Sequence, residues 1–262
     1  MFAGVNPAGP FAGRVAMVTG GGSAIGRAIA GQLGAAGVAV AVVALSSARA
    51  EATVEAVRAA GGEAAGFAAD FHDPGSIPDL VHAVEQVFGE VDILVNNAAT
   101  VTPLGPVADL DSAAVLRALT INVASVVTLA GMVIPAMSRH GWGRIANVCG
   151  VIGNLASWAG GNVYAACAAA LEAHTVNLAA ELTGTGITVN ALRVHRMGTS
   201  LRTWLAGVDP AAIDDPLIRR FVVSQTDVGI VDFDGSAADL LGRLATTETG
   251  RIWNAVHRGP VG

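Results

Sequence analysis

Short apolar runs alternate with helix-length segments along most of the chain. The expected strands are the apolar runs at residues 14–19, 38–45, 63–69, 91–95, 144–149, 187–193 and 252–256. The expected helices lie between them, at residues 24–36, 49–60, after Pro74, near 109–119 and 121–138, and at 161–182 and 236–246. This alternation predicts an α/β fold in which a Rossmann-like, doubly wound parallel sheet is flanked by helices.

The length of 262 residues suits one domain of this kind. Residues 1–12, with two prolines among glycine and alanine, predict a flexible N-terminal extension before a domain at 13–262. The pattern breaks down at 197–235, where charged residues and two prolines are mixed. This variable segment fits either a flap over a substrate site or a plain surface loop.

Residues 119–137 contain no charged side chain, which raises the question of a membrane span. Asn122, Ser125, Thr128 and Pro135 interrupt the run, and we therefore predict no membrane insertion. Together with the alanine-rich residues 165–171, the segment predicts a subunit interface, with burial inside the domain as the alternative.

The amino-acid composition limits which binding partners and which cellular compartment are expected. The formal net charge is −6 and no arginine-rich run occurs, so nucleic acid is not expected to bind. The two cysteines, Cys149 and Cys167, form no metal or disulfide pattern, and no signal segment is recognised at the N-terminus, which favours the cytoplasm. The chain has fifteen arginines and no lysine, so every cationic side chain other than histidine is a guanidinium.

A glycine-rich turn, Thr19-Gly20-Gly21-Gly22-Ser23-Ala24-Ile25-Gly26, follows the first expected strand and opens a helix. Backbone amides and a helix N-terminus in this arrangement can hold a pyrophosphate. Asp70 ends the third strand, Asn96-Asn97-Ala98-Ala99 ends the fourth, and Tyr164 opens the helix after the fifth. On these motifs, the chain from residue 13 onward resembles the short-chain dehydrogenase/reductase family.

The resemblance implies NAD- or NADP-dependent hydride transfer between an alcohol and a carbonyl by a tetrad of Asn, Ser, Tyr and Lys, in a homotetramer. It assigns the cofactor, if one binds, to Thr19, Gly20, Gly22, Ser23, Ile25, Gly26, Asp70, Asn96 and Ala98. No metal site is expected.

Only part of the tetrad is present. Tyr164 and Asn122 match the family pattern, but Ala168 stands where the lysine is expected, four residues after the tyrosine. Gly150 stands where the serine is expected, and shifting the register by one residue brings Val151 there instead. Without a neighbouring cation, ionising a phenol of pKa about 10 at pH 7 costs about 4 kcal/mol.

The cofactor positions also depart from the family pattern. Ala24 replaces the middle glycine of the turn, Ala99 replaces a glycine after the fourth strand, and Val194-His195 replaces Pro-Gly. Leu45-Ser46-Ser47 offers neither an acid for a ribose diol nor a clear cation for a 2′-phosphate. We therefore expect binding of NAD or NADP to be weak or lost.

Three hypotheses follow from this comparison. The first is a non-catalytic subunit of a tetramer with an active paralogue that acts on a small molecule or acyl-CoA, as in heteromeric family members of the (hydroxybenzyl)succinyl-CoA dehydrogenase type. The second is an atypical NAD(P)-dependent oxidoreductase that relies on Tyr164. The third is a cofactor-free isomerase or cyclase that uses Tyr164 with Arg193 and His195.

Several side chains near the expected site allow a plain interpretation. Arg193, His195 and Arg196 form an anion site, a solvated basic rim or a subunit contact. Cys149 is interpreted as a small buried residue, and Glu172 and His174 as surface or interface groups.

Overall fold

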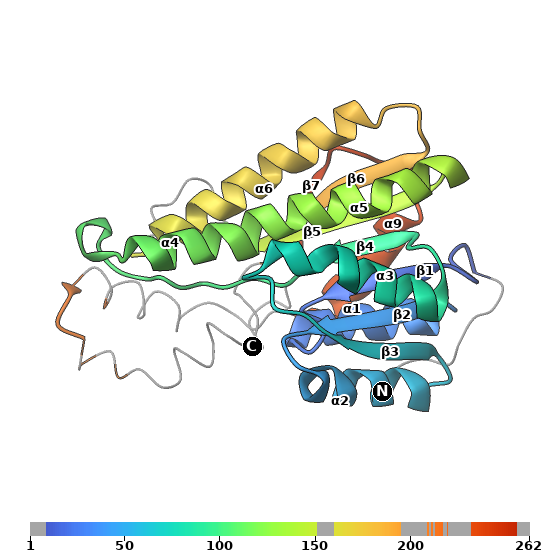
Figure 1. Ribbon diagram of the computed structural model, residues 1–262, viewed down its shortest axis with the longest axis horizontal. Helices are drawn as coiled ribbons and strands as arrows, with labels where there is room; N and C mark the ends of the chain where they lie inside the picture. The colour runs from blue at the N-terminus through green and yellow to red at the C-terminus, as the bar shows by residue number, and fades with distance from the viewer. Residues whose placement is uncertain are drawn as a thin grey trace, which may run out of the picture.

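The computed structural model describes residues 9–150, 160–194, 209, 211, 213–216, 219 and 232–255. Its centre is a parallel sheet of seven strands in the order β3-β2-β1-β4-β5-β6-β7 (Figure 1). The strands are β1 (Val15–Thr19), β2 (Ala39–Ala44), β3 (Glu63–Ala68), β4 (Ile93–Asn96), β5 (Gly143–Gly150), β6 (Ile187–Val194) and β7 (Ile252–Asn254). The predicted fold class is confirmed.

Helices cover both faces of the sheet (Figure 1). One face carries α1 (Ala24–Ala35), α2 (Ser47–Ala59) and α9 (Phe233–Leu244). The other carries α3 (Ile77–Phe88), α5 (Ser125–His140) and α6 (Asn162–Glu181). The short helix α4 (Ser112–Leu119) precedes α5, and two 3-10 turns lie at Pro74–Ser76 and Val107–Asp109.

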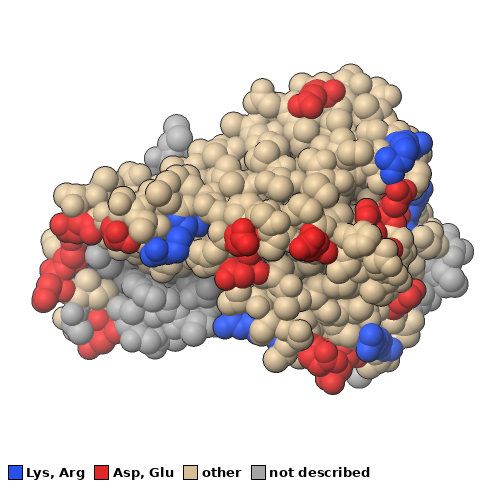
Figure 2. Space-filling view, viewed as in Figure 1, with Lys and Arg blue, Asp and Glu red and all other residues tan. Residues whose placement is uncertain are grey.

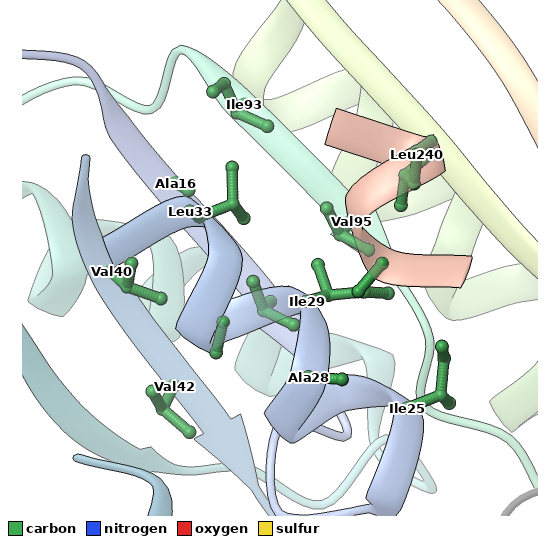
Figure 3. Close-up of a cluster of buried hydrophobic side chains, with 14 of the residues drawn as sticks. Ala16, Ile25, Ala28, Ile29, Leu33, Val40, Val42, Ile93, Val95 and Leu240 are labelled. Carbon is green, nitrogen blue, oxygen red and sulfur yellow. The ribbon is translucent and has the colours of Figure 1, made fainter. Parts of the chain in front are cut away.

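The core has one layer on each side of the sheet. On the first face, Ile25, Ile29 and Leu33 of α1 belong to one buried cluster, and Ile29 lies beside Val95 of β4 (Figure 3). Residues three or four apart share a helix face, so their spacing builds this layer. On the second face, β-strand side chains pack against α3, α5 and α6. Burial of the sheet on both faces fixes where the strands end and therefore where a site can form.

The helices expected at 109–119 and 121–138 differ from the observed ones in one respect. They form a continuous segment, Ser112–His140, because a π-helical turn at Thr120–Ala124 joins α4 to α5. By length and composition, this segment could cross a membrane. Its inner side lies in the second core layer through Leu129, Val133 and Met137, as expected for a helix of a folded domain.

Residues 1–8 of the expected extension and nearly all of the variable segment 197–235 lie outside the described residues. Phe11, which we assigned to the N-terminal extension, is 2% exposed and belongs to the first core layer. An apolar side chain of the predicted extension therefore contributes to the core, and the boundary at residue 13 stays a prediction.

Candidate functional site

A cavity of about 950 Å³ lies at the carboxyl ends of the strands, from β3 to β6. It crosses the point between β1 and β4 where the strand order reverses, which is the usual ligand crevice of a doubly wound sheet. The predicted site residues that line it are Gly20, Gly22, Ser23, Ile25, Asp70, Ala98, Gly150 and Tyr164. The others do not reach its wall among the described residues: Thr19, Gly26, Asn96, Asn122 and Ala168.

The glycine turn between β1 and α1 is tightly packed. A Cβ on Gly22 would lie 2.4 Å from the Arg49 carbonyl oxygen, and one on Gly26 would lie 2.3 Å from the Gly20 carbonyl oxygen. Gly20 itself has a positive φ of 61°. Glycine is therefore required here for the turn to approach α2 and for α1 to pack on the turn.

Asn97 and Thr19 join this turn to the end of β4. The Asn97 side chain donates to the carbonyl oxygens of Thr19 and Gly20 at 3.0 and 3.1 Å, and the Thr19 hydroxyl accepts from the amides of Asn97 and Ala98. Thr19 does not line the cavity itself, but its hydroxyl holds the backbone of Asn97 and Ala98, and Ala98 is part of the cavity wall. Two adjacent strand ends are thus fixed relative to each other.

Asn96 points away from the cavity into a buried hydrogen-bond chain. Its amide donates to Asn147 of β5, whose amide donates to the Thr175 hydroxyl of α6, each at 2.9 Å. Asn96 is 2% exposed. Its place favours a role in linking β4, β5 and α6 rather than in touching a ligand.

The turn also offers hydrogen-bond donors to a ligand. The Ser23 side chain caps α1 by accepting from the Gly26 amide. The amides of Gly22, Ala24 and Ile25 have no hydrogen-bond partner among the described residues. Unpaired amides at a helix N-terminus, beside a cavity of this size, fit the pyrophosphate of a dinucleotide.

The altered glycine positions affect the cavity unequally. Ala99 lines the cavity, but Ala24 does not, so the methyl group that Ala24 adds to the turn is not part of the wall. Weak dinucleotide binding stays a prediction.

Two arginines that sequence reasoning missed lie at the β2 end of the cavity. Arg27 of α1 and Arg49 of α2 line it, are exposed, and have no carboxylate partner in the described chain. Nearby, the Asp70 carboxylate accepts from the backbone and ring of His72, and these hydrogen bonds hold its pKa below the ordinary value. The signal available in the sequence was an arginine in the first turn of the helix after β2.

Tyr164 lies at the opposite end of the cavity, in the first turn of α6. Its ring is 6% exposed, and its hydroxyl oxygen accepts a hydrogen bond from the Gly150 backbone. Burial, and to a lesser degree the Cys149 thiol, raises the pKa of the phenol well above its ordinary value, although the Gly150 hydrogen bond opposes the shift. Tyr164 is therefore a neutral hydroxyl throughout the physiological pH range.

Asn122 lies in the π-helical turn, and its side-chain amide is hydrogen-bonded to the backbone of another segment. Its side chain accepts from the Thr100 amide and donates to the Thr100 carbonyl, both at 2.8 Å. Asn122 thus holds the loop after β4 against the end of α4. This is the structural role that its place at a helix irregularity favours.

Ala168, at the expected lysine position, is buried in an apolar cluster. Its neighbours there are Val126, Cys149, Leu171 and Ala191. The methyl group is 2% exposed. The surroundings of position 168 are apolar, so an ammonium group there would have no charge partner in this cluster.

Cys149 and Arg193 lie beside this end of the site. Burial raises the pKa of the Cys149 thiol to about 12, and Glu172 adds to the shift. Arg193 forms a bidentate ion pair with Glu172, with distances of 2.6 and 2.7 Å. The Glu172 side chain is 19% exposed, and its carboxylate already neutralises the guanidinium of Arg193, which leaves less charge for an anionic substrate. His195 and Arg196 lie outside the described residues.

Comparison with known proteins gives a consistent result. Residues 14–205 match the family model described as short chain dehydrogenase. The chain is 36% identical over 242 residues to 3-oxoacyl-[acyl-carrier-protein] reductase FabG of Escherichia coli (strain K12), covering 92% of this chain and 93% of that protein. It is 34% identical over 246 residues to cis-4-hydroxycyclohexanecarboxylate dehydrogenase of Sinomonas cyclohexanicum, covering 94% of each.

Solved structures agree. An NAD+-bound xylitol dehydrogenase superposes with a TM-score of 0.82 at 27% identity, covering 95% of this chain and all of that one. A single-residue variant of actinorhodin polyketide ketoreductase with NADPH superposes with a TM-score of 0.79 at 28% identity, covering 95% of this chain and 97% of that one.

These relatives contradict the hypothesis of a non-catalytic subunit that partners an active paralogue. They are named as reductases and dehydrogenases, and they match this chain over nearly its whole length. The loss of the serine and lysine side chains leaves Tyr164 in the wall of the cavity.

Proposed function

Because this chain belongs to the short-chain dehydrogenase family, we propose that it is a nicotinamide-dependent oxidoreductase that reduces the carbonyl group of a small molecule. The observation that carries the proposal is a single cavity with unpaired amides of a glycine turn at one end and the Tyr164 hydroxyl at the other. A cofactor and a substrate can meet in such a cavity.

The proposed cofactor is NADP(H) rather than NAD(H). Arg27 and Arg49 are both available at the β2 end, where the adenosine of a dinucleotide held by the glycine turn would lie. A guanidinium without a carboxylate partner suits a phosphate, to which it can donate two parallel hydrogen bonds. The residues after β2 include no acid that would favour an unmodified ribose.

The proposed chemical role of Tyr164 is that of a proton donor. A reduced nicotinamide, when bound, supplies a hydride to the carbonyl carbon. As the carbonyl oxygen gains the electron pair of its π bond, the Tyr164 hydroxyl donates a hydrogen bond and then its proton to that oxygen. The resulting phenolate regains a proton from water, so the reaction consumes one hydride and one proton.

Burial keeps Tyr164 in the protonated form from which carbonyl reduction starts. An alkoxide is a stronger base than a phenolate, so the proton passes to the substrate oxygen. Without a lysine, the phenolate lacks a cation beside it both when reduction forms it and when alcohol oxidation requires it. Only oxidation, however, needs the phenolate to be present before the reaction starts.

The experiment is to follow NADPH oxidation with a panel of ketones and aldehydes in the wild type and in Tyr164→Phe. Loss of the hydroxyl is expected to lower kcat by about 100- to 1,000-fold, as for removal of an oxyanion-hole donor, with unchanged affinity for NADPH. Equal rates in the two proteins, or no reduction of any carbonyl by the wild type, would contradict the proposal.

We further propose that copies of this chain associate through α4, α5 and α6, and that the enzyme works in the cytoplasm. Leu116, Val127, Met132 and Val176 are large apolar side chains that stay exposed on these helices. The surface over α5 and α6 carries few charges (Figure 2). An apolar face of this kind supports burial against a second copy of itself, as the homotetramers implied by the family resemblance would require.

A further inference from the structure

We propose that Gly150 is the residue that positions Tyr164, because the absence of a side chain at this position admits the phenol hydroxyl to the end of β5. The catalytic consequence rests on the proposed function. The packing does not, since it follows from the distances alone.

The space beside Gly150 is already filled by Tyr164. A Cβ at position 150 would lie 2.4 Å from the Tyr164 hydroxyl oxygen, 2.5 Å from Cε1 and 2.9 Å from Cζ. Every residue other than glycine has a Cβ, so alanine and serine are excluded equally from the observed arrangement. A contact with three atoms of a rigid ring cannot be relieved by rotating one flexible end.

Neither partner can easily move away. Gly150 is paired with Val194 in the sheet, which holds its backbone. The Tyr164 ring is enclosed, with the thiols of Cys149 and Cys167 near enough to affect its ionisation. A hydrogen bond from the Gly150 backbone to the Tyr164 hydroxyl also holds the phenol in place. The glycine and the tyrosine therefore form a matched pair.

This packing changes the meaning of the missing serine. The phenol hydroxyl occupies the volume in which a serine at position 150 would begin its side chain. One hydroxyl therefore stands where the family pattern has two, and it both binds the carbonyl oxygen and donates the proton. A substrate that accepts a hydrogen bond, a neutral ketone or aldehyde, is the class that a single neutral hydroxyl recognises.

The two interpretations of Gly150 predict opposite effects of restoring the family residue. If the serine hydroxyl were merely absent, Gly150→Ser would raise the rate of carbonyl reduction. If Gly150 positions Tyr164, Gly150→Ser and Gly150→Ala both displace the phenol and lower the rate, by about 100-fold for a displacement near 1 Å.

Tyr164 is the single tyrosine of the chain, so the ultraviolet absorbance of phenolate reports this residue alone. In the wild type, no phenolate is expected to form before alkaline unfolding. In folded Gly150→Ser and Gly150→Ala, the displaced phenol is expected to titrate near its ordinary pKa of about 10. Gly242→Ala in α9 is the matched control, because a Cβ there meets nothing within 4 Å, and it should behave as the wild type.

A wild type that forms phenolate near pH 10 while still folded would overturn the proposal, as would a Gly150→Ser variant with faster reduction and an unmoved tyrosine. If the variants fail to fold, the ring-carbon resonance of the labelled tyrosine in the wild type decides: a shift that stays constant up to unfolding supports the pair, and a titration near pH 10 overturns it. Loss of the proposed function would show itself separately, as an absence of reductase activity with the tyrosine signal unchanged.

Discussion

The ionisable side chains along the cavity have opposite surroundings at its two ends. Arg27 and Arg49 are exposed cations at the β2 end. Tyr164 and Cys149 are buried, and burial raises the pKa of each, so both stay neutral. The first end suits a charged phosphate and the second suits an uncharged reacting group.

Arg49→Ala tests the charged end. Loss of a charge-assisted hydrogen bond worth about 1.5–3 kcal/mol predicts about 10- to 100-fold weaker binding of NADPH, with NADH binding little changed. Calorimetric titration with both dinucleotides measures this. Arg117→Ala, which removes the same charge from an exposed position on α4, is the control and should leave both affinities unchanged. Equal weakening for NADH and NADPH would argue against a 2′-phosphate contact.

The sequence predicted only some of the individual site residues. The glycine turn, Asp70 and Tyr164 could be located from spacing, because their function depends on the backbone and on strand ends. The clash between a Cβ at Gly150 and the Tyr164 ring could not, because it depends on where a ring from another helix points. The pairing of Arg193 with Glu172 was missed for the same reason, since the residues belong to β6 and α6.

Among the elements, α6 contributes residues both to the cavity and to the core. Tyr164 lines the cavity from its first turn, Ala168 lies one turn later in the apolar cluster, and Thr175 bonds the asparagine of β5. These residues share the side of the helix that faces the sheet. The position of the missing lysine is therefore a core position in this protein.

Ala168→Lys should destabilise the protein rather than restore the family tetrad. A buried ammonium without a carboxylate partner is expected to lower the free energy of unfolding by about 3–5 kcal/mol. Asn177→Lys, at an exposed position of the same helix, should change it by no more than about 0.5 kcal/mol. Denaturant unfolding measures both. A stable Ala168→Lys with faster turnover would show that the cluster accommodates the charge.

The sequence predicted the elements well because apolar periodicity reflects burial directly. Each expected strand has a counterpart, and the order of strands and helices is as predicted. The junction of α4 and α5 was not predicted, because a π-helical turn changes the hydrogen bonding without changing the apolar pattern.

For the whole molecule, the surface over α5 and α6 carries few charged side chains in the view of Figure 2. Val127 of α5 is 44% exposed. Val127→Asp is expected to convert the assembly into monomers, because a two-fold interface brings the new carboxylates into the same buried contact twice. Sedimentation velocity measures the change.

Val87→Asp on α3 is the matched control, since this valine is 55% exposed and lies outside α5 and α6. It should leave the assembly intact. A wild type that sediments as a monomer, or an assembly that survives Val127→Asp, would rule out this interface.

The pH dependence of the two reaction directions tests the central claim most directly, that a neutral Tyr164 serves a working carbonyl reductase. Because burial raises the pKa of Tyr164, the phenol stays protonated and the rate of ketone reduction should be constant from about pH 6 to 9. The rate of alcohol oxidation, which needs the phenolate, should rise about tenfold per pH unit without a plateau. A reduction rate that falls through this range while oxidation levels off would show an acidic tyrosine and contradict the account.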